Sequence, residues 1–193
     1  MPRWKPDARE RLVEAALDLF TEQGYDETTV AQIAERAELT RSTFFRHFSD
    51  KRELLSAGQE MLSALLAEGI AAAPDDATPL EAVAAGLDRA AGAMTEFNRG
   101  IGPRMHAAIE ANEELRARNA MKSIGLAAAM AEALQRRGAA ESVARVAAEL
   151  GVLAFGIGYR RWSAPARDEA PGELVTYTRE AFAELRAAAA ELR

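Results

Sequence analysis

The chain has 193 residues, of which 49% are hydrophobic and only 6% aromatic, so we expect a core of Ala, Leu, Val and Ile and an all-α fold. It has no cysteine, which excludes disulfides, thiolate metal sites and cysteine nucleophiles. The net charge of −6 disfavours nucleic-acid binding, but within residues 39–52 four basic side chains stand against one acidic side chain.

The N-terminal part is predicted to contain three short helices that lead into a longer one. Apolar residues recur there at the spacing of core-facing helices. Thr29 and Gln32 form a capping box that begins the second helix. Thr40 caps the third helix, and Asp50 is expected to cap the fourth together with Glu53. The expected ranges are 7–23 with Gly24 as its C-terminal cap, a short helix from residue 29, 41–48, and 50 to about 72.

The rest of the chain is predicted to be helical as well. Thr78, Pro79 and Glu81 supply an N-cap, a proline at the first helical position and a capping-box carboxylate. This helix is expected to end near Phe97, because Asn, Gly and Pro cluster over residues 98–103. Further helices are expected at 104–111, at 112–137 stopped by Gly138, at 141–162 and at 173–193, with a loop at 163–172.

The stretch TTVAQIAERAELTRSTFFRHF, residues 28–48, has the spacing of a helix-turn-helix. A tight connection at residues 38–40 separates two helices, and Phe44 and Phe48 are expected on their buried side. In this motif the second helix lies in the major groove of DNA, although the pattern alone also fits a plain helical hairpin. The residues expected at or near DNA are Arg41, Ser42, Thr43, Phe45 and Arg46.

Residues 8–55 resemble the DNA-binding domain of the tetracycline-repressor (TetR) family. One register matches the family pattern at Phe20, Gly24, Tyr25, Thr28, Thr29, Ile33, Ala34, Ala37, Thr43, His47, Phe48, Lys51 and Leu54. The resemblance implies a three-helix DNA-binding domain at residues 1–50, followed by a helical effector-binding and dimerisation domain at residues 51–193. It also implies a sequence-specific regulator, by default a repressor that a small organic effector releases from a palindromic operator.

The resemblance also assigns roles in DNA binding. It implies that Thr29 and Lys51 hold phosphates and that His47 lies close to the DNA backbone. The groove-facing residues would be Thr40, Arg41, Ser42, Thr43 and Arg46.

Two positions depart from the family pattern. Ser42 stands where the family often has Gly, and Phe45 stands where it usually has a Tyr that donates to a phosphate. Phe45 cannot donate, so we expect any contact that it makes to be apolar, for example with a thymine methyl group.

Some of these side chains have alternative interpretations. Arg41 and Arg46 could be solvated surface charges, and His47 could form a hydrogen bond within the domain. Arg3 and Lys5 could belong either to a disordered tail or to an arm that touches DNA.

In the C-terminal part, Met and aromatic side chains at helical spacing suit either an irregular core or a permissive pocket. Arg104 and His106 could neutralise an acidic group on an otherwise apolar effector. The pocket candidates are Met61, Leu65, Met94, Phe97, Met105, His106, Ile109, Met121, Ile124, Phe155 and Tyr159. The apolar faces of the last two helices predict a homodimer through Leu150, Leu153, Ile157, Leu174, Phe182 and Leu185.

Rival functions have little support in the sequence. His106 and Glu110 have a spacing that could hold a metal, but further ligands are lacking, so we expect neither a metal nor a cofactor. There is no G-x-S-x-G motif, no phosphate-binding G-x-x-x-x-G-K-[ST] motif and no cysteine, so an enzyme is not expected. An interaction module without DNA would leave the basic cluster unexplained. With a charged N-terminus and no apolar run of about 20 residues, we expect a cytoplasmic protein without membrane attachment.

Overall fold

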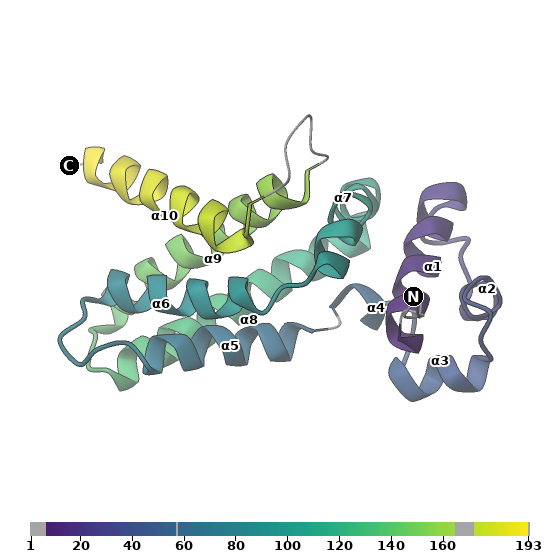
Figure 1. The fold of residues 1–193 in the computed structure, drawn as a ribbon, viewed down its shortest axis with the longest axis horizontal. Coiled ribbons are helices and arrows are strands. Elements are labelled where there is room, and N and C mark those ends of the chain that lie inside the picture. The colour runs from purple at the N-terminus through teal and green to yellow at the C-terminus, as the bar shows by residue number, and fades with distance from the viewer. Residues whose placement is uncertain (1–6, 57, 165–171, 193) are drawn as a thin grey trace, which may run out of the picture. The chain divides into compact units, whose positions relative to one another are not determined.

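The computed structural model describes residues 7–56, 58–164 and 172–192, and the regular elements within these ranges are all α-helices (Figure 1). The predicted all-α fold class is therefore confirmed. The tail with Arg3 and Lys5, and most of the loop predicted at 163–172, lie outside the described residues. The helices are α1 (Ala8–Gln23), α2 (Val30–Arg36), α3 (Arg41–His47), α4 (Glu53–Ser56), α5 (Gln59–Ala71), α6 (Pro79–Gly92), α7 (Glu96–Ala111), α8 (Glu113–Arg136), α9 (Glu141–Ser163) and α10 (Leu174–Glu191).

The chain divides into two compact units. The first unit comprises Met1–Ala57 and Ile101–Asn119, and the second comprises Gly58–Gly100 and Ala120–Arg193. The first unit therefore takes in most of α7 and the start of α8 besides the N-terminal helices.

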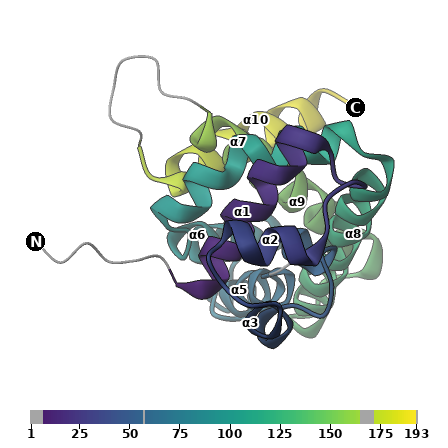
Figure 2. The ribbon, with the colours of Figure 1, turned by 90° about the vertical axis from the view of Figure 1, so that its right-hand side faces the viewer.

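In the first unit, α2 and α3 pack against α1 around an apolar core (Figure 2). The caps predicted from the sequence are present at both short helices. The Thr29 side chain accepts from the backbone N–H of Gln32 in a reciprocal capping box, and the Thr40 side chain accepts from Thr43. Fully buried side chains close the core, namely Leu12, Leu17, Ile33, Phe44, Phe48 and Leu54.

The fourth helix was expected to run unbroken to about residue 72, and this expectation is wrong. The structure has α4 and α5 instead, and Gly58 between them has a φ of +92°. A left-handed backbone cannot continue a right-handed helix, and glycine adopts it without the steric cost of a Cβ atom. The predicted start is confirmed, because the Asp50 carboxylate accepts from the backbone N–H of Glu53 at 3.0 Å.

The break expected at residues 98–103 is also wrong, because α6 ends at Gly92 and α7 runs through Pro103 to Ala111. Asn98 begins a helix here and does not end one. Its side-chain oxygen accepts from the backbone N–H and from the hydroxyl of Thr95, each at 2.9 Å, which satisfies donors that a helix N-terminus would leave unpaired.

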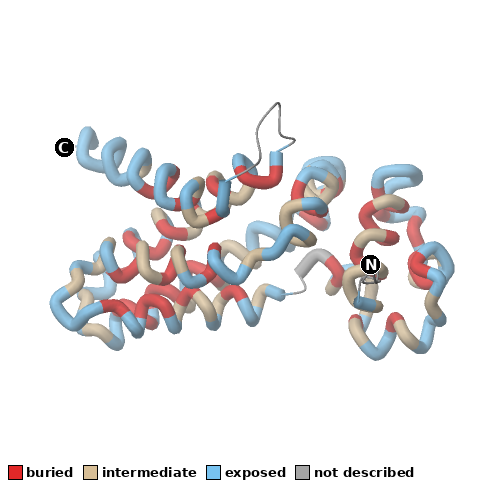
Figure 3. The backbone as a smooth tube through the Cα atoms, in the orientation of Figure 1, coloured by how far each residue is buried: buried red, intermediate tan, exposed pale blue. Residues whose placement is uncertain are grey.

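In the second unit, the helices approach so closely that glycine is required where they meet. A Cβ atom on Gly69 of α5 would lie 2.6 Å from the Cα atom of Gly86 on α6. One on Gly158 of α9 would lie 2.8 Å from backbone atoms of Thr178 on α10. Figure 3 shows buried turns recurring along α5, α6 and α9, as the alanine-rich composition predicts.

By length and composition alone, α9 could cross a membrane, since part of it has a mean hydropathy of 1.3. This observation is weak, because core helices of soluble proteins pass the same test. Here α9 packs against α6 and α10.

Candidate nucleic-acid interface

The third helix, α3, has one face in the core and one face exposed. Phe44 and Phe48 are 0% and 1% exposed, and their ring centroids lie 5.6 Å apart. Both were predicted on the buried side, which is confirmed. The outer face carries Arg41, Ser42, Phe45 and Arg46, all exposed.

The turn between α2 and α3 contains a residue with an unfavourable backbone conformation. Glu38 has a φ of +54°, the single positive φ at a non-glycine residue within the described ranges. Arg11 of α1 supports this turn, because its guanidinium donates to the Ala37 carbonyl and to the Glu38 carboxylate, the latter at 3.3 Å. Arg11 was not among the residues predicted from the sequence, because the helical spacing of α1 contains no signal for this contact.

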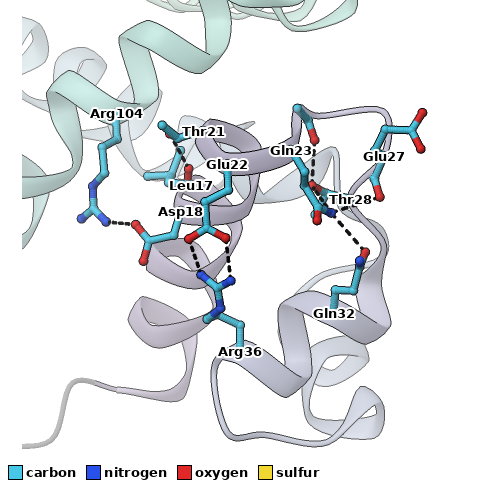
Figure 4. Close-up of polar contacts among 11 residues, drawn as sticks. Leu17, Asp18, Thr21, Glu22, Gln23, Glu27, Thr28, Gln32, Arg36 and Arg104 are labelled. Carbon is cyan, nitrogen blue, oxygen red and sulfur yellow. Dashed lines mark hydrogen bonds and ion pairs between the residues drawn. The ribbon is translucent and has the colours of Figure 1, made fainter.

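A row of acids on α1 holds neighbouring helices through ion pairs (Figure 4). Glu22 accepts two hydrogen bonds from Arg36 of α2, at 2.8 and 2.6 Å. One turn earlier, Asp18 accepts from Arg104 of α7 at 2.5 Å, and Glu14 lies 3.8 Å from the same guanidinium. Arg104, proposed above to neutralise an acidic effector, is thus already paired with two carboxylates in the first unit.

Lys51 has an internal role that the sequence did not predict. Its Nζ atom donates to the carbonyls of Tyr25, Asp26 and Thr28, at 2.7, 3.2 and 2.9 Å. It also lies 4.3 Å from the centroid of the Tyr25 ring. Because an ammonium group has three N–H donors, these contacts can use all of them in this structure. Binding of a phosphate by Lys51 stays a prediction.

The ring of Tyr25 lies against the ammonium group of Lys51. Its ring packs edge-on against Phe20 with centroids 5.0 Å apart, and its buried hydroxyl has no hydrogen-bond partner among the described residues. Burial raises the pKa of Tyr25 to about 12. The phenol therefore stays neutral, and its ring face stabilises the ammonium group.

Arg41 and Arg46 differ from the other cations of the first unit. No hydrogen bond or ion pair joins either guanidinium to another residue that the structure describes. Arg9 lies over the Phe48 ring, 5.5 Å from its centroid. Each remaining Arg or Lys described in this unit has a hydrogen-bond partner within it, and these are Arg11, Arg36, Lys51, Arg52, Arg104, Arg116 and Arg118. The two guanidinium groups on the outer face of α3 are thus free to meet an external anion.

The remaining predicted DNA contacts lie around the same helix. Thr29, Thr40 and Thr43 use their hydroxyls in helix caps or with each other, including a 2.9 Å bond between Thr40 and Thr43. His47 is half-buried beside Phe48, with ring centroids 6.4 Å apart. Contact with DNA remains a prediction for all of these residues.

The predicted effector residues fall in both units. Met105, His106 and Ile109 belong to the first unit and the others to the second. Met61, Met121 and Ile124 are exposed, and the rest are half-buried: Leu65, Met94, Phe97, Met105, His106, Ile109, Phe155 and Tyr159.

The second unit gathers a subset of these residues beside the core of α6 and α9. Met94, Phe155 and Tyr159 pack against the buried Trp162 and its neighbours. The Phe155 and Tyr159 rings stack with centroids 6.4 Å apart, and the Tyr159 hydroxyl donates to the Asn98 carbonyl at 2.5 Å. Burial raises the pKa of Tyr159 to about 12, so this hydroxyl keeps its proton.

Two predicted dimer residues are buried within their own chain. Leu174 and Phe182 are 2% and 3% exposed, so the expectation that they form an exposed face of α10 is wrong. The inner face of α10 packs on α9, and this contact uses them. Leu150, Ile157 and Leu185 are half-buried, and the large exposed apolar residues of α9 are Val143, Val146 and Leu153.

Comparison with known proteins finds a family that the N-terminal part of the chain resembles. Residues 12–57 match the model of the bacterial regulatory proteins of the tetR family. This segment of the chain is therefore similar to the TetR family. The matched segment begins at Leu12 within α1 and extends past α4, so it contains the capped α3 helix and the Lys51 site, whereas Arg11 lies one residue before it.

Curated relatives match only part of the chain. The regulator TcmR of Streptomyces glaucescens is 39% identical over 75 residues, which are 39% of this chain and 33% of TcmR. SrpR of Pseudomonas putida is 41% identical over 51 residues, 26% of this chain and 24% of SrpR. The matches thus span a third or less of these relatives. Both are named HTH-type transcriptional regulators, in agreement with the prediction that the chain is not an enzyme.

Solved structures extend the TetR likeness to nearly the whole chain. Thermus thermophilus FadR, a TetR-family repressor in complex with lauroyl-CoA, aligns with a TM-score of 0.53 at 25% identity over 92% of this chain and 93% of its own. A regulator from Aquifex aeolicus VF5 aligns with a TM-score of 0.52 at 21% identity over 93% and 98%. At that identity the second match supports the fold alone.

Proposed function

We propose that this chain is a sequence-specific DNA-binding transcriptional regulator whose α3 helix enters the major groove of operator DNA. The observation that carries the proposal is the free state of Arg41 and Arg46 on a helix whose other face is fixed in the core. Guanidinium groups suit both phosphates and guanine edges. Because the neighbouring cations have internal partners, the positive charge offered to DNA is concentrated on α3.

The regulator is further proposed to act as a homodimer in the cytoplasm. A dimer would present two α3 helices to a palindromic site, whose half-site spacing mirrors the symmetry of the protein. The exposed apolar residues Val143, Val146 and Leu153 of α9 support such an interface, because a solvated row of this kind is costly.

We propose that the protein represses transcription and that a small, mainly apolar effector relieves this repression. The cluster of Met94, Phe155 and Tyr159 supports this choice, because adaptable and aromatic side chains suit organic ligands. The FadR structure supports it as well, since that relative is a repressor in complex with lauroyl-CoA. Lauroyl-CoA is therefore a suitable first probe, and the expected result is release of DNA.

The test begins with selection of bound fragments from sheared genomic DNA. Affinity for a selected fragment is then measured at several salt concentrations for the wild type and for the double variant Arg41→Ala/Arg46→Ala. Steep salt dependence and tight sites are expected for the wild type, and loss of both for the double variant. Arg136→Ala, in an exposed position on α8, is the control for a loss of positive charge. A wild type that selects no fragment would exclude the proposal.

A further inference from the structure

Phe45 is a large apolar residue on the outer face of α3. Its side chain is 51% exposed, and it is the one large apolar residue exposed in the part of the first unit that the structure describes. The other large exposed apolar residues belong to the second unit. Exposing this ring to water is unfavourable, so a partner that covers the ring would lower the free energy of the resulting complex.

The ring of Phe45 packs against a buried ring of the core. It meets Phe44 edge-to-face, with centroids 5.4 Å apart and an interplanar angle of 81°. Phe44 is fully buried and packs in turn on Phe48. Such aromatic pairs favour a defined geometry, so the position of the exposed ring is linked to the core.

The neighbours of Phe45 are the two free guanidinium groups. Arg41 lies one turn before it on the helix, and Arg46 follows it directly in the sequence. Residues four apart share a helix face, so a surface that approaches Arg41 also approaches Phe45.

We propose that Phe45 reads the 5-methyl group of a pyrimidine in the major groove, so that each half-site carries thymine at the matching position. This inference rests on the proposed DNA-binding function. A phenyl ring has no hydrogen-bonding group and would leave phosphate oxygens and polar base edges unpaired. The thymine methyl is the apolar group that the major-groove edges offer.

The experiment replaces each thymine of a selected operator, one position at a time, by deoxyuridine. This change removes the methyl group and leaves base pairing and hydrogen-bonding groups intact. We expect one symmetric pair of positions where the substitution weakens binding roughly four-fold per half-site, the factor that burial of one methyl group supplies. In Phe45→Ala the same substitution should change nothing, and in Phe45→Tyr, which keeps the ring, the effect should remain.

The outcomes separate this inference from the proposed function. If the wild type binds the operator tightly with steep salt dependence but all uridine substitutions are neutral, the Phe45 inference fails and the function stands. It fails in the same way if the methyl effect persists in Phe45→Ala, or if this variant weakens operator and scrambled duplex equally, as a backbone contact would. A wild type without affinity for DNA would overturn both.

Discussion

The first unit is held together by aromatic rings and charged hydrogen bonds, whereas the second combines its ion pairs with small residues at close helix crossings. In the first unit, Lys51 binds three carbonyls and the acids of α1 pair with arginines. In the second, glycines such as Gly69 and Gly86 allow α5 and α6 to touch at the backbone. Polar networks fix the direction of side chains, whereas close packing of Ala and Gly fixes mainly the spacing of helices.

This difference bears on function. A surface that reads DNA must hold a few side chains in defined directions, and the first unit does so by pairing its cations internally except for Arg41 and Arg46. A domain that responds to a ligand needs helices that can repack. The ion pairs that join the helices of the second unit are largely exposed to solvent, and exposed pairs of this kind contribute little to stability. The predictions below test whether the two units depend on these different features.

The largest effect is expected from a larger side chain at the crossing of α5 and α6. Gly69→Val would drive a Cβ atom to within 2.6 Å of the backbone of Gly86, and such overpacking should cost roughly 3 kcal/mol of unfolding free energy. Urea unfolding followed by far-UV circular dichroism measures this. Gly100→Ala in α7 is the matched control, because its Cβ atom meets nothing within 4 Å and should stabilise the helix by about 0.5–1 kcal/mol. Equal stabilities of the two variants would contradict the close packing of α5 and α6.

A somewhat smaller effect is expected at the exposed row of α9. Val146 is 63% exposed, and Val146→Glu places a charge in the proposed dimer interface, which should weaken dimerisation about 100-fold, equivalent to about 2.7 kcal/mol. Light scattering over a concentration series should find a dimer for the wild type and a monomer for the variant. Met61→Glu, also at an exposed apolar residue, should remain dimeric. A dimer that tolerates Val146→Glu would place the interface elsewhere.

The contrast between the units also explains what the sequence could predict. The caps at Thr29 and Thr40 and the burial of Phe44 and Phe48 follow from local spacing, and these were predicted correctly. Contacts between distant residues were not. The hydrogen bonds from Lys51 to the carbonyls of residues 25–28, and from Arg11 to the turn before α3, correspond to no periodic pattern in the sequence.

Errors in the second unit have a related cause. Asn98 and its neighbouring glycines indicate a loop by composition, but the pairing of Asn98 with Thr95 makes them the start of α7. Leu174 and Phe182 were assigned to a dimer face because periodicity reveals an apolar face without showing what covers it. In the structure α9 of the same chain packs on this face of α10.

The smallest effect concerns the turn before α3. Glu38 adopts a φ of +54°, so Glu38→Gly should relieve backbone strain. Two smaller effects oppose this gain, namely the loss of the exposed ion pair with Arg11 and the greater entropy of glycine in the unfolded chain. We expect a net rise in the unfolding free energy of about 0.5–1 kcal/mol. Thermal unfolding measures the shift. Glu35→Gly in α2 should have the opposite sign, since glycine within a helix costs about 1 kcal/mol. Destabilisation by Glu38→Gly would mean that the contact with Arg11 outweighs the strain.

The most direct test of the account compares Arg46→Ala with Lys51→Met, since both remove one positive charge close to α3. Affinity for operator and scrambled duplexes is measured at several salt concentrations, at a temperature where both variants are folded. Arg46→Ala should cost roughly 1–3 kcal/mol on the operator and less on the scrambled duplex. Lys51→Met should lower stability but keep the wild-type salt slope, because its ammonium group binds carbonyls. If Lys51→Met lowered the slope by about one per half-site while Arg46→Ala bound like the wild type, the assignment of free and internally paired cations would be contradicted.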